Sequence, residues 1–275
     1  MKSISFLILI MIYSCSNVAQ KDQRHVNCDS LNLFVCVNLD SALKYHECVF
    51  VLKLCIDTTI FKMPPLTGLN KNIDIEIYNK HGLDWINTFE ELSKIDTIAK
   101  LSIKDYSILK IPQSIRKLKN VKVLVLEFPR VNDIPSTLGD LENLKELWIY
   151  SNNIQTIPKE LKKLKCLKKL FVISLNNSTI PQEVFSISEL QSLGLGNRIN
   201  YIPKEIIKLK KLEELILLNT PIAEREETFY FKNKSYNELQ FIADSLPNCK
   251  LILRLMLPPA RPTQAKPPFR PPSPR

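Results

Sequence analysis

The spacing of apolar residues in the stretch 144–158, LKELWIYSNNIQTIP, constrains the fold of this chain more than any other feature. The steps from Leu144 to Leu147, Ile149 and Asn152 are three, two and three positions. A helix would repeat near 3.6 residues and a strand near 2. A short strand followed by a turning loop accounts for this mixture. We expect Asn152 to satisfy buried backbone groups in the loop, and Pro158 to bend the chain so that a new turn begins. One such unit cannot bury its own apolar face, so copies are expected on both sides.

The copies are present. An Ile-Pro pair recurs at intervals of 23, 23, 23 and 22 residues, at Ile111-Pro112, Ile134-Pro135, Ile157-Pro158, Ile180-Pro181 and Ile202-Pro203. A pair of apolar residues two positions apart recurs with it, at Leu101/Ile103, Leu124/Leu126, Leu147/Ile149, Leu170/Val172, Leu193/Leu195 and Leu215/Leu217. Weaker copies precede these at Leu52/Leu54 and Ile75/Ile77. A period of this length is typical of a solenoid of stacked repeats.

With these residues the chain resembles the leucine-rich repeat family, in its 23-residue form closed by Ile-Pro or Leu-Pro, over roughly residues 43–253. The resemblance implies an α/β solenoid: an arc of about eight repeats with a concave parallel β-sheet, short helices or turns on the convex side, and a cap at each end. Pro158 and Pro203 are expected at the first position of convex helices. Trp85 is expected to cover the wider gap of an irregular repeat between residues 67 and 92.

The first fifteen residues, MKSISFLILIMIYSC, have the pattern of an export signal. Lys2 precedes an apolar run of about ten residues, which is too short to span a bilayer. Residues 12–15 resemble a bacterial lipobox, although Tyr13 departs from its tighter forms. This resemblance implies that residues 1–14 are removed and that Cys15 carries lipid at the cell envelope, the outer membrane or the cell surface. The alternative is an ordinary secretory signal cut between Ser14 and Ala19, which gives a secreted protein.

Five segments are therefore expected. They are a signal peptide (1–14), a tether and N-terminal cap (15–41), the leucine-rich repeats (42–222), a C-terminal cap (223–257) and a disordered tail rich in proline and arginine (258–275). In the C-terminal cap, residues 236–246 have helical spacing and residues 251–255 resemble a strand.

The cysteines are consistent with disulfides, which an oxidising compartment outside the cell permits in an exported repeat protein. Four of them, Cys28, Cys36, Cys48 and Cys55, suit disulfides near the N-terminal cap, and their three alternative pairings stay open. Cys166 and Cys249 are expected to be small core residues. The spacings do not suit zinc, and no catalytic motif stands beside the three histidines, His25, His46 and His81. We therefore expect no catalytic residue, no cofactor and no metal.

The net charge of +10 does not indicate nucleic-acid binding, because its basic residues are not focused into one stripe. Arg261, Lys266, Arg270 and Arg275 lie in the tail, and the other charges are interleaved with acids. The lysine runs 162–169 and 208–211 are interpreted as a solvated convex face. The alternative is a patch that contacts an anionic membrane or polysaccharide.

In each strand the paired apolar residues face the core, so the residues beside them face the concave surface. The predicted partner-binding residues on that surface are Val125, Glu127, Phe128, Trp148, Tyr150, Phe171 and Ile173. The predicted charged periphery comprises Lys53, Glu76, Lys104 and Asp105. An apolar centre with a polar rim is typical of a protein-binding surface. The alternative is that the aromatic residues stiffen neighbouring strands by packing against each other.

The sequence thus favours a non-enzymatic module that binds a partner protein or peptide on its concave face and a membrane through an N-terminal lipid. Two alternatives stay open. One is a binder of cell-surface carbohydrate or peptidoglycan, which stacked aromatic residues also suit. The other is an intracellular scaffold similar to Ras-binding leucine-rich repeat proteins, to which the Ile-Pro repeat type is close.

Overall fold

The computed structural model describes residues 35–36, 51–56, 63, 65–66, 69, 72–79, 83–152, 154, 156–174, 180–218, 220–226 and 236–254. The predicted signal peptide, the lipid site at Cys15, the proline-rich tail, and Cys28 and Cys48 lie outside these residues. The side chains of Cys36 and Cys55 lie outside them too. Within the described part, none of the helices is long and apolar enough to cross a membrane.

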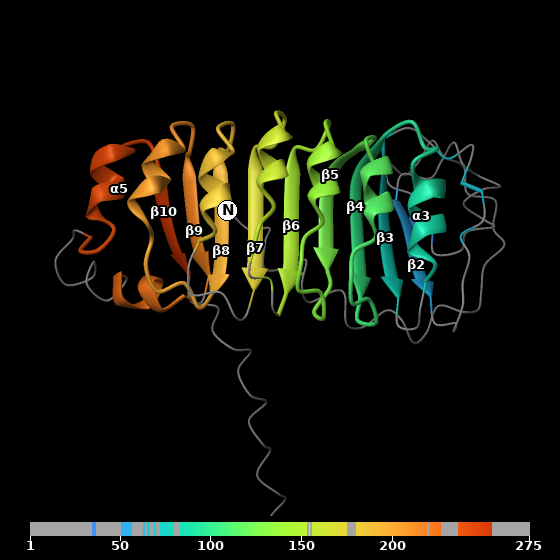
Figure 1. Ribbon diagram of the computed structural model, residues 1–275, viewed down its shortest axis with the longest axis horizontal. Helices are drawn as coiled ribbons and strands as arrows, with labels where there is room; N and C mark the ends of the chain where they lie inside the picture. The colour runs from blue at the N-terminus through green and yellow to red at the C-terminus, as the bar shows by residue number, and fades with distance from the viewer. Residues whose placement is uncertain are drawn as a thin grey trace, which may run out of the picture.

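The described strands form one parallel sheet of ten strands in sequence order (Figure 1). They are β1 (Val35–Cys36), β2 (Val51–Ile56), β3 (Ile73–Asn79), β4 (Ile98–Asp105), β5 (Val121–Glu127), β6 (Glu146–Ser151), β7 (Lys169–Ser174), β8 (Ser192–Asn197), β9 (Glu214–Leu218) and β10 (Lys250–Arg254). Every predicted apolar pair lies in its own strand. Leu147, for example, pairs with Leu124 on one side and Leu170 on the other. Each repeat therefore contributes one strand, as the periodicity predicted.

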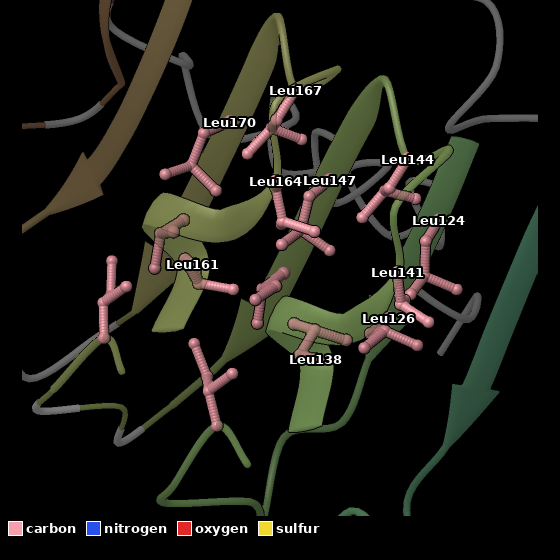
Figure 2. Close-up of a cluster of buried hydrophobic side chains, with 14 of the residues drawn as sticks. Leu124, Leu126, Leu138, Leu141, Leu144, Leu147, Leu161, Leu164, Leu167 and Leu170 are labelled. Atoms are coloured by element: carbon pink, nitrogen blue, oxygen red, sulfur yellow. The ribbon is translucent and has the colours of Figure 1, made fainter. Parts of the chain in front are cut away.

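The core lies between this sheet and the short helices that cover one of its faces (Figures 1 and 2). Each regular repeat places leucines on three sides of the same space. Leu147 enters it from β6, Leu138 from the convex helix, and Leu141 and Leu144 from the turns between them (Figure 2). These four side chains are fully buried. Burying a leucine contributes about 1.5–3 kcal/mol relative to leaving it exposed, so the repeats stabilise one another through this shared core.

The convex helices are single 3₁₀ turns: η4 (Gln113–Lys117), η5 (Ser136–Asp140), η6 (Lys159–Lys163), η7 (Gln182–Ser186) and η8 (Lys204–Lys208). The proline of each Ile-Pro pair stands one residue before the helix. The first helical position predicted for Pro158 and Pro203 is therefore wrong. Pro158 has the extended backbone angles φ −66° and ψ 137°, and its carbonyl accepts the N–H of Leu161 at 3.0 Å. Pro158 thus caps the helix with its carbonyl and needs no N–H of its own.

The irregular repeat carries a true α-helix, α3 (Trp85–Leu92), in place of a 3₁₀ turn. Asp84 caps its N-terminus, because the carboxylate accepts the N–H of Asn87 at 3.0 Å. The pairing of β3 with β4 also shifts between Ile73 and Asp74. The longer helix and this irregularity accommodate the extra residues of the repeat. Trp85 is 5% exposed and packs in the core, in agreement with its predicted role.

In and next to the predicted C-terminal cap (223–257), the structure has a helix at 221–226, which begins two residues before the predicted boundary, α5 (Gln240–Ser245) and β10. The helix α5 is shorter than the predicted span of 236–246. Glu226, only 1% exposed, accepts the backbone N–H groups of Asn237 at 2.9 Å and Glu238 at 2.6 Å. Its neighbour Arg225 forms two hydrogen bonds with the Glu238 carboxylate, at 2.7 and 2.9 Å. These contacts join the two sides of segment 227–235.

Buried polar side chains stand one position earlier in the repeat than predicted. Asn152 is exposed, so its predicted role inside the loop is wrong. The preceding Ser151 is buried, and its hydroxyl donates to the carbonyl of Val131 at 2.6 Å. The reason is strand alternation, which points Ser151, two residues after Ile149, to the same side as Leu147 and Ile149.

Asp105 occupies this same position in β4 and is fully buried. Its predicted place on the charged concave periphery is therefore wrong. The carboxylate accepts five hydrogen bonds, from Trp85 Nε1 (2.7 Å), Asn79 Nδ2 (2.8 Å), the N–H and hydroxyl of Ser107 (2.7 Å each) and the N–H of Ile108 (3.1 Å). Burial by itself raises the pKa of Asp105, but the bonds from Ser107, Asn79 and Trp85 outweigh burial and lower it.

The two described cysteines with free thiols have different environments. Cys249 is 9% exposed, and burial raises the pKa of its thiol to about 11. Its prediction as a core residue is confirmed. Cys166 is exposed, so the same prediction is wrong for it. It stands in the turn between η6 and β7, between the inward-facing residues Leu164 and Leu167.

Candidate functional site

The concave face is formed by the residues of each strand that alternate with the buried leucines. In the middle of the sheet, Val125 is paired with Trp148, which is paired with Phe171, which is paired with Gly194. A second row, two residues further along the strands, holds Glu127, Tyr150, Ile173 and Gly196. Six of the seven predicted partner-binding residues lie in these two rows: Val125, Glu127, Trp148, Tyr150, Phe171 and Ile173.

Phe128, the seventh predicted residue, does not lie on the concave face. It follows β5 at the inward-facing position, is 1% exposed and packs against Trp85 with ring centroids 6.2 Å apart. Phe128 takes the place that Ser151 and Asp105 occupy in other repeats, and it fills the core there. Its assignment to the partner-binding surface is wrong.

Trp148 and Phe171 stack face to face, with ring centroids 3.7 Å apart and planes inclined by 2°. Phe171 in turn leans over Gly194, because a Cβ at residue 194 would lie 1.9 Å from its Cδ1 atom. Phe171 is consequently only 5% exposed, whereas Trp148 is partly exposed. Phe171 therefore lies between Trp148 and Gly194 of the neighbouring strands, and the alternative of packing between neighbouring strands describes this pair of rings.

The surface that remains open around Trp148 is small and mostly apolar. Val125, Tyr150 and Ile173 are each partly exposed. Burial raises the pKa of the Tyr150 phenol, and the negative charge of Glu127 adds to this rise. Tyr150 is therefore neutral at physiological pH. We name this group of residues, Val125, Trp148, Tyr150 and Ile173, the aromatic patch.

Charged side chains beside the aromatic patch are paired. Lys104 and Glu127, on neighbouring strands, form an ion pair of 2.6 Å. The Lys104 ammonium lies 5.2 Å from the ring centre of Tyr106, and the Tyr106 hydroxyl donates to Glu127 at 3.3 Å. Burial lowers the pKa of Lys104, but its hydrogen bonds to Glu127 and Tyr106 outweigh that effect and raise it. Lys104 thus stays charged at neutral pH and remains paired with the Glu127 carboxylate.

Tyr78 and Tyr106 extend this cluster toward the N-terminus and were not among the predicted site residues. Their rings meet edge to face, with centroids 6.4 Å apart, and Tyr106 is 41% exposed. Tyr78 stands in the same row as Glu127 and Tyr150, which is a signal the sequence offered. Tyr106 follows the buried Asp105, and nothing in the repeat pattern marks it.

Within the part of the chain that the structure describes, no three His, Cys, Asp or Glu side chains are close enough to hold a metal ion. The aromatic patch offers an apolar contact surface beside the ion pair of Lys104 and Glu127. Such a surface suits the binding of another molecule by burial of apolar area.

Comparison with solved structures identifies leucine-rich repeat proteins. The chain is similar to internalin C2 of Listeria monocytogenes, with 21% identity and a TM-score of 0.51, over 76% of this chain and 81% of that protein. It also matches a leucine-rich repeat protein of Leptospira interrogans with 22% identity and a TM-score of 0.49, over 74% of this chain and 55% of that protein, so it spans about half of that protein's length. No protein-family model and no curated protein matches the chain. At this identity the similarity shows the fold alone, and that fold is the predicted leucine-rich repeat solenoid.

Proposed function

We propose that this leucine-rich repeat solenoid binds a partner protein or peptide on its concave face, with Trp148 as the central contact. The observation that carries the proposal is the stack of Trp148 on Phe171, which holds a large and partly exposed aromatic ring in one orientation. Tryptophan and tyrosine are enriched among the residues that contribute most to binding. A ring that is already immobilised loses little further conformational entropy when a partner covers it.

The charges around the aromatic patch favour a partner with a mostly apolar contact surface. Lys104 and Glu127 neutralise each other on one side, and Glu146 and Lys169 form a second pair of 2.9 Å on neighbouring strands. A paired charge at the rim contributes little to affinity, but it excludes partners that place an unpaired charge there. The binding free energy would then come mainly from covering Trp148, Tyr150 and Val125.

The substitution Trp148→Ala tests this site. Because Trp148 is partly exposed, we expect a modest effect on folding and a loss of about 2 kcal/mol or more in partner affinity. Tyr201→Ala is the matched control, since Tyr201 is 52% exposed and lies outside the concave rows. The measurement is capture of a cross-linked partner from the cell surface, followed by titration of the purified partner. Equal affinity of the two variants would exclude the aromatic patch as the binding site.

The same titration separates the carbohydrate alternative. A protein-free glycan or peptidoglycan fragment that binds the unsubstituted chain and is lost in Trp148→Ala would support carbohydrate binding. If the glycan alone does not bind and the partner polypeptide is required, the result supports binding of a protein or peptide on the concave face.

We further infer that the chain is exported and carries lipid on Cys15, with residues 1–14 removed. The support is the apolar run after Lys2 and the similarity of residues 12–15 to a lipobox. Together with the aromatic patch, export favours a protein partner at the cell envelope or cell surface. The mature chain would then consist of the tether and N-terminal cap (15–41), the repeats (42–222), the C-terminal cap (223–257) and the tail (258–275). The intact mass of the protein from membranes tests the inference. A chain that retains Met1 would exclude it and favour an intracellular scaffold.

A further inference from the structure

Three lysines stand in line along one edge of the solenoid, where the strands begin. Lys122 lies near the start of β5, and Lys145 and Lys168 immediately precede β6 and β7. The N–H of Lys145 donates to the carbonyl of Lys122 at 2.7 Å, and the N–H of Lys168 to that of Lys145 at 2.9 Å. Their backbones are thus neighbours across the sheet, about 4.8 Å apart from one strand to the next. We name these three residues the lysine column.

The lysine column departs from the charge pattern in the rest of the sheet. Elsewhere, charged residues on neighbouring strands pair with opposite charges, as in Lys53–Glu76 at 3.1 Å and Glu146–Lys169 at 2.9 Å. Like charges placed opposite each other on adjacent strands are destabilising. The three positive charges in register therefore do not stabilise the fold, and a function outside folding accounts for them better.

The positive charge of the column is not neutralised within the described residues. Lys145 and Lys168 are exposed and form no ion pair there. Lys122 donates a hydrogen bond of 2.8 Å to the neutral side chain of Asn72, so its charge also remains. The exposed Lys165 lies in the turn before Lys168 and adds to the local potential.

Apart from the exposed Lys165, the column has paired charges on both sides. On one side, Lys119 and Glu142 form an ion pair of 3.1 Å, and on the other side Glu146 pairs with Lys169. The column itself ends at the next two strands, where Gln191 and then Glu213 take the corresponding position. A row of positive charges whose flanks are neutralised except at Lys165 fits a linear anion better than a broad charged plane.

We propose that the lysine column binds a linear anionic polysaccharide, whose carboxylate or sulfate groups lie along the edge of the sheet over β5, β6 and β7. A membrane surface would meet a wider basic area than this. Single-stranded nucleic acid is bound by basic grooves that also stack bases on aromatic rings, and the stretches 119–123, 142–146 and 165–169 contain no aromatic residue. This surface is separate from the aromatic patch and does not rest on it.

The triple variant Lys122→Gln, Lys145→Gln, Lys168→Gln tests the proposal in the full chain. The control is Lys204→Gln, Lys208→Gln, Lys210→Gln, which removes the same charge from exposed positions on and next to η8. The probes are fluorescent heparin and oligogalacturonate oligosaccharides, titrated at several salt concentrations. We expect the column variant to lose at least tenfold in affinity for one or both probes and to show a weaker dependence on salt. The control should stay within about twofold of the unsubstituted chain.

Two further measurements keep the outcome unambiguous. The melting temperature of the column variant should be unchanged or higher, because like-charge repulsion is removed. Trp148→Ala should bind both probes normally, which separates this site from the concave face. An equal loss of probe affinity in the control variant would overturn the proposal, because binding would then depend on the net charge of the chain and not on the lysine column. Column-dependent binding to phosphatidylglycerol vesicles or poly(U), with neither oligosaccharide bound, would overturn it in favour of a membrane or a nucleic acid.

Discussion

The ring of Phe171 occupies the space that a Cβ atom at Gly194 would need, since the two would be 1.9 Å apart. The glycine is therefore required by a close approach between neighbouring strands rather than by its backbone angles. Because Trp148 stacks on the other side of Phe171, the absence of a side chain at residue 194 sets the position of both rings.

The substitution Gly194→Ala should displace Phe171 and disturb the Trp148 stack. We expect a loss of about 1–3 kcal/mol in the free energy of unfolding, which is typical of overpacking, together with a change in the near-UV circular dichroism of the rings. Chemical denaturation and circular dichroism measure the two effects.

Gly196→Ala is the matched control for this prediction. A Cβ there would lie 2.9 Å from the Cγ2 atom of Ile173, so the clash is milder and the expected loss smaller. Phe171→Leu should partly rescue Gly194→Ala, because the two side chains compete for the same volume. Equal effects of the two glycine substitutions would contradict this account.

Asp105 should contribute strongly to stability. Asp105→Ala leaves the buried donors of Trp85 and Asn79 without their acceptor, and each such loss costs about 1–3 kcal/mol. We therefore expect a decrease of about 3 kcal/mol in the free energy of unfolding, measured by urea denaturation. Ser102→Ala, at a partly exposed concave position of the same strand, should change it little.

The stabilisation by Asp105 should depend on pH. Its pKa is lower in the folded protein than the ordinary value of 3.8, so the unfolded chain takes up the proton first as the pH falls. The contribution is complete above about pH 4–5 and is lost as the pH falls through the folded pKa. The difference in unfolding free energy between the unsubstituted chain and Asp105→Asn should shrink between pH 7 and pH 3. A constant difference over this range would show that the charge of Asp105 is not the stabilising feature.

The two free thiols should react at different rates. Cys166 is exposed, whereas Cys249 is buried and has a pKa of about 11, which leaves little thiolate at pH 7.5. Brief treatment with iodoacetamide followed by peptide mass spectrometry should therefore label Cys166 and spare Cys249. Both should be labelled after denaturation in urea. Rapid labelling of Cys249 in the native protein would argue against its burial.

The strands of this solenoid were predictable because each leucine pair faces a core that only regular spacing can fill. The same regularity predicted the concave rows, since residues between buried leucines must face the other way. Six of the seven predicted partner-binding residues lie in those rows for this reason. Repeat length also predicted that the repeat between residues 67 and 92 would be irregular.

The environment within a row was not predictable from the spacing. Phe128, directly after β5, and Asp105, the last residue of β4, occupy the same inward-facing position, but one is apolar and the other is a carboxylate with five donors. Trp85 relates these two side chains, because its ring packs against Phe128 and its N–H donates to the Asp105 carboxylate. The spacing of the repeats does not reveal these contacts. Phe171 is buried because Gly194 leaves room for its ring, and that depends on two residues in different repeats.

The contacts of Arg225 and Glu226 with the backbone and side chain of residues 237 and 238 have a consequence for changes in chain length. These contacts hold residues 225–226 against residues 237–238, independently of the number of residues between them. The entropic cost of closing a chain between two fixed points rises by only about 0.6 kcal/mol for each doubling of its length. An epitope or a fluorescent label inserted in this segment would therefore leave the stack of repeats intact, and this makes the C-terminal cap the natural place to tag the protein.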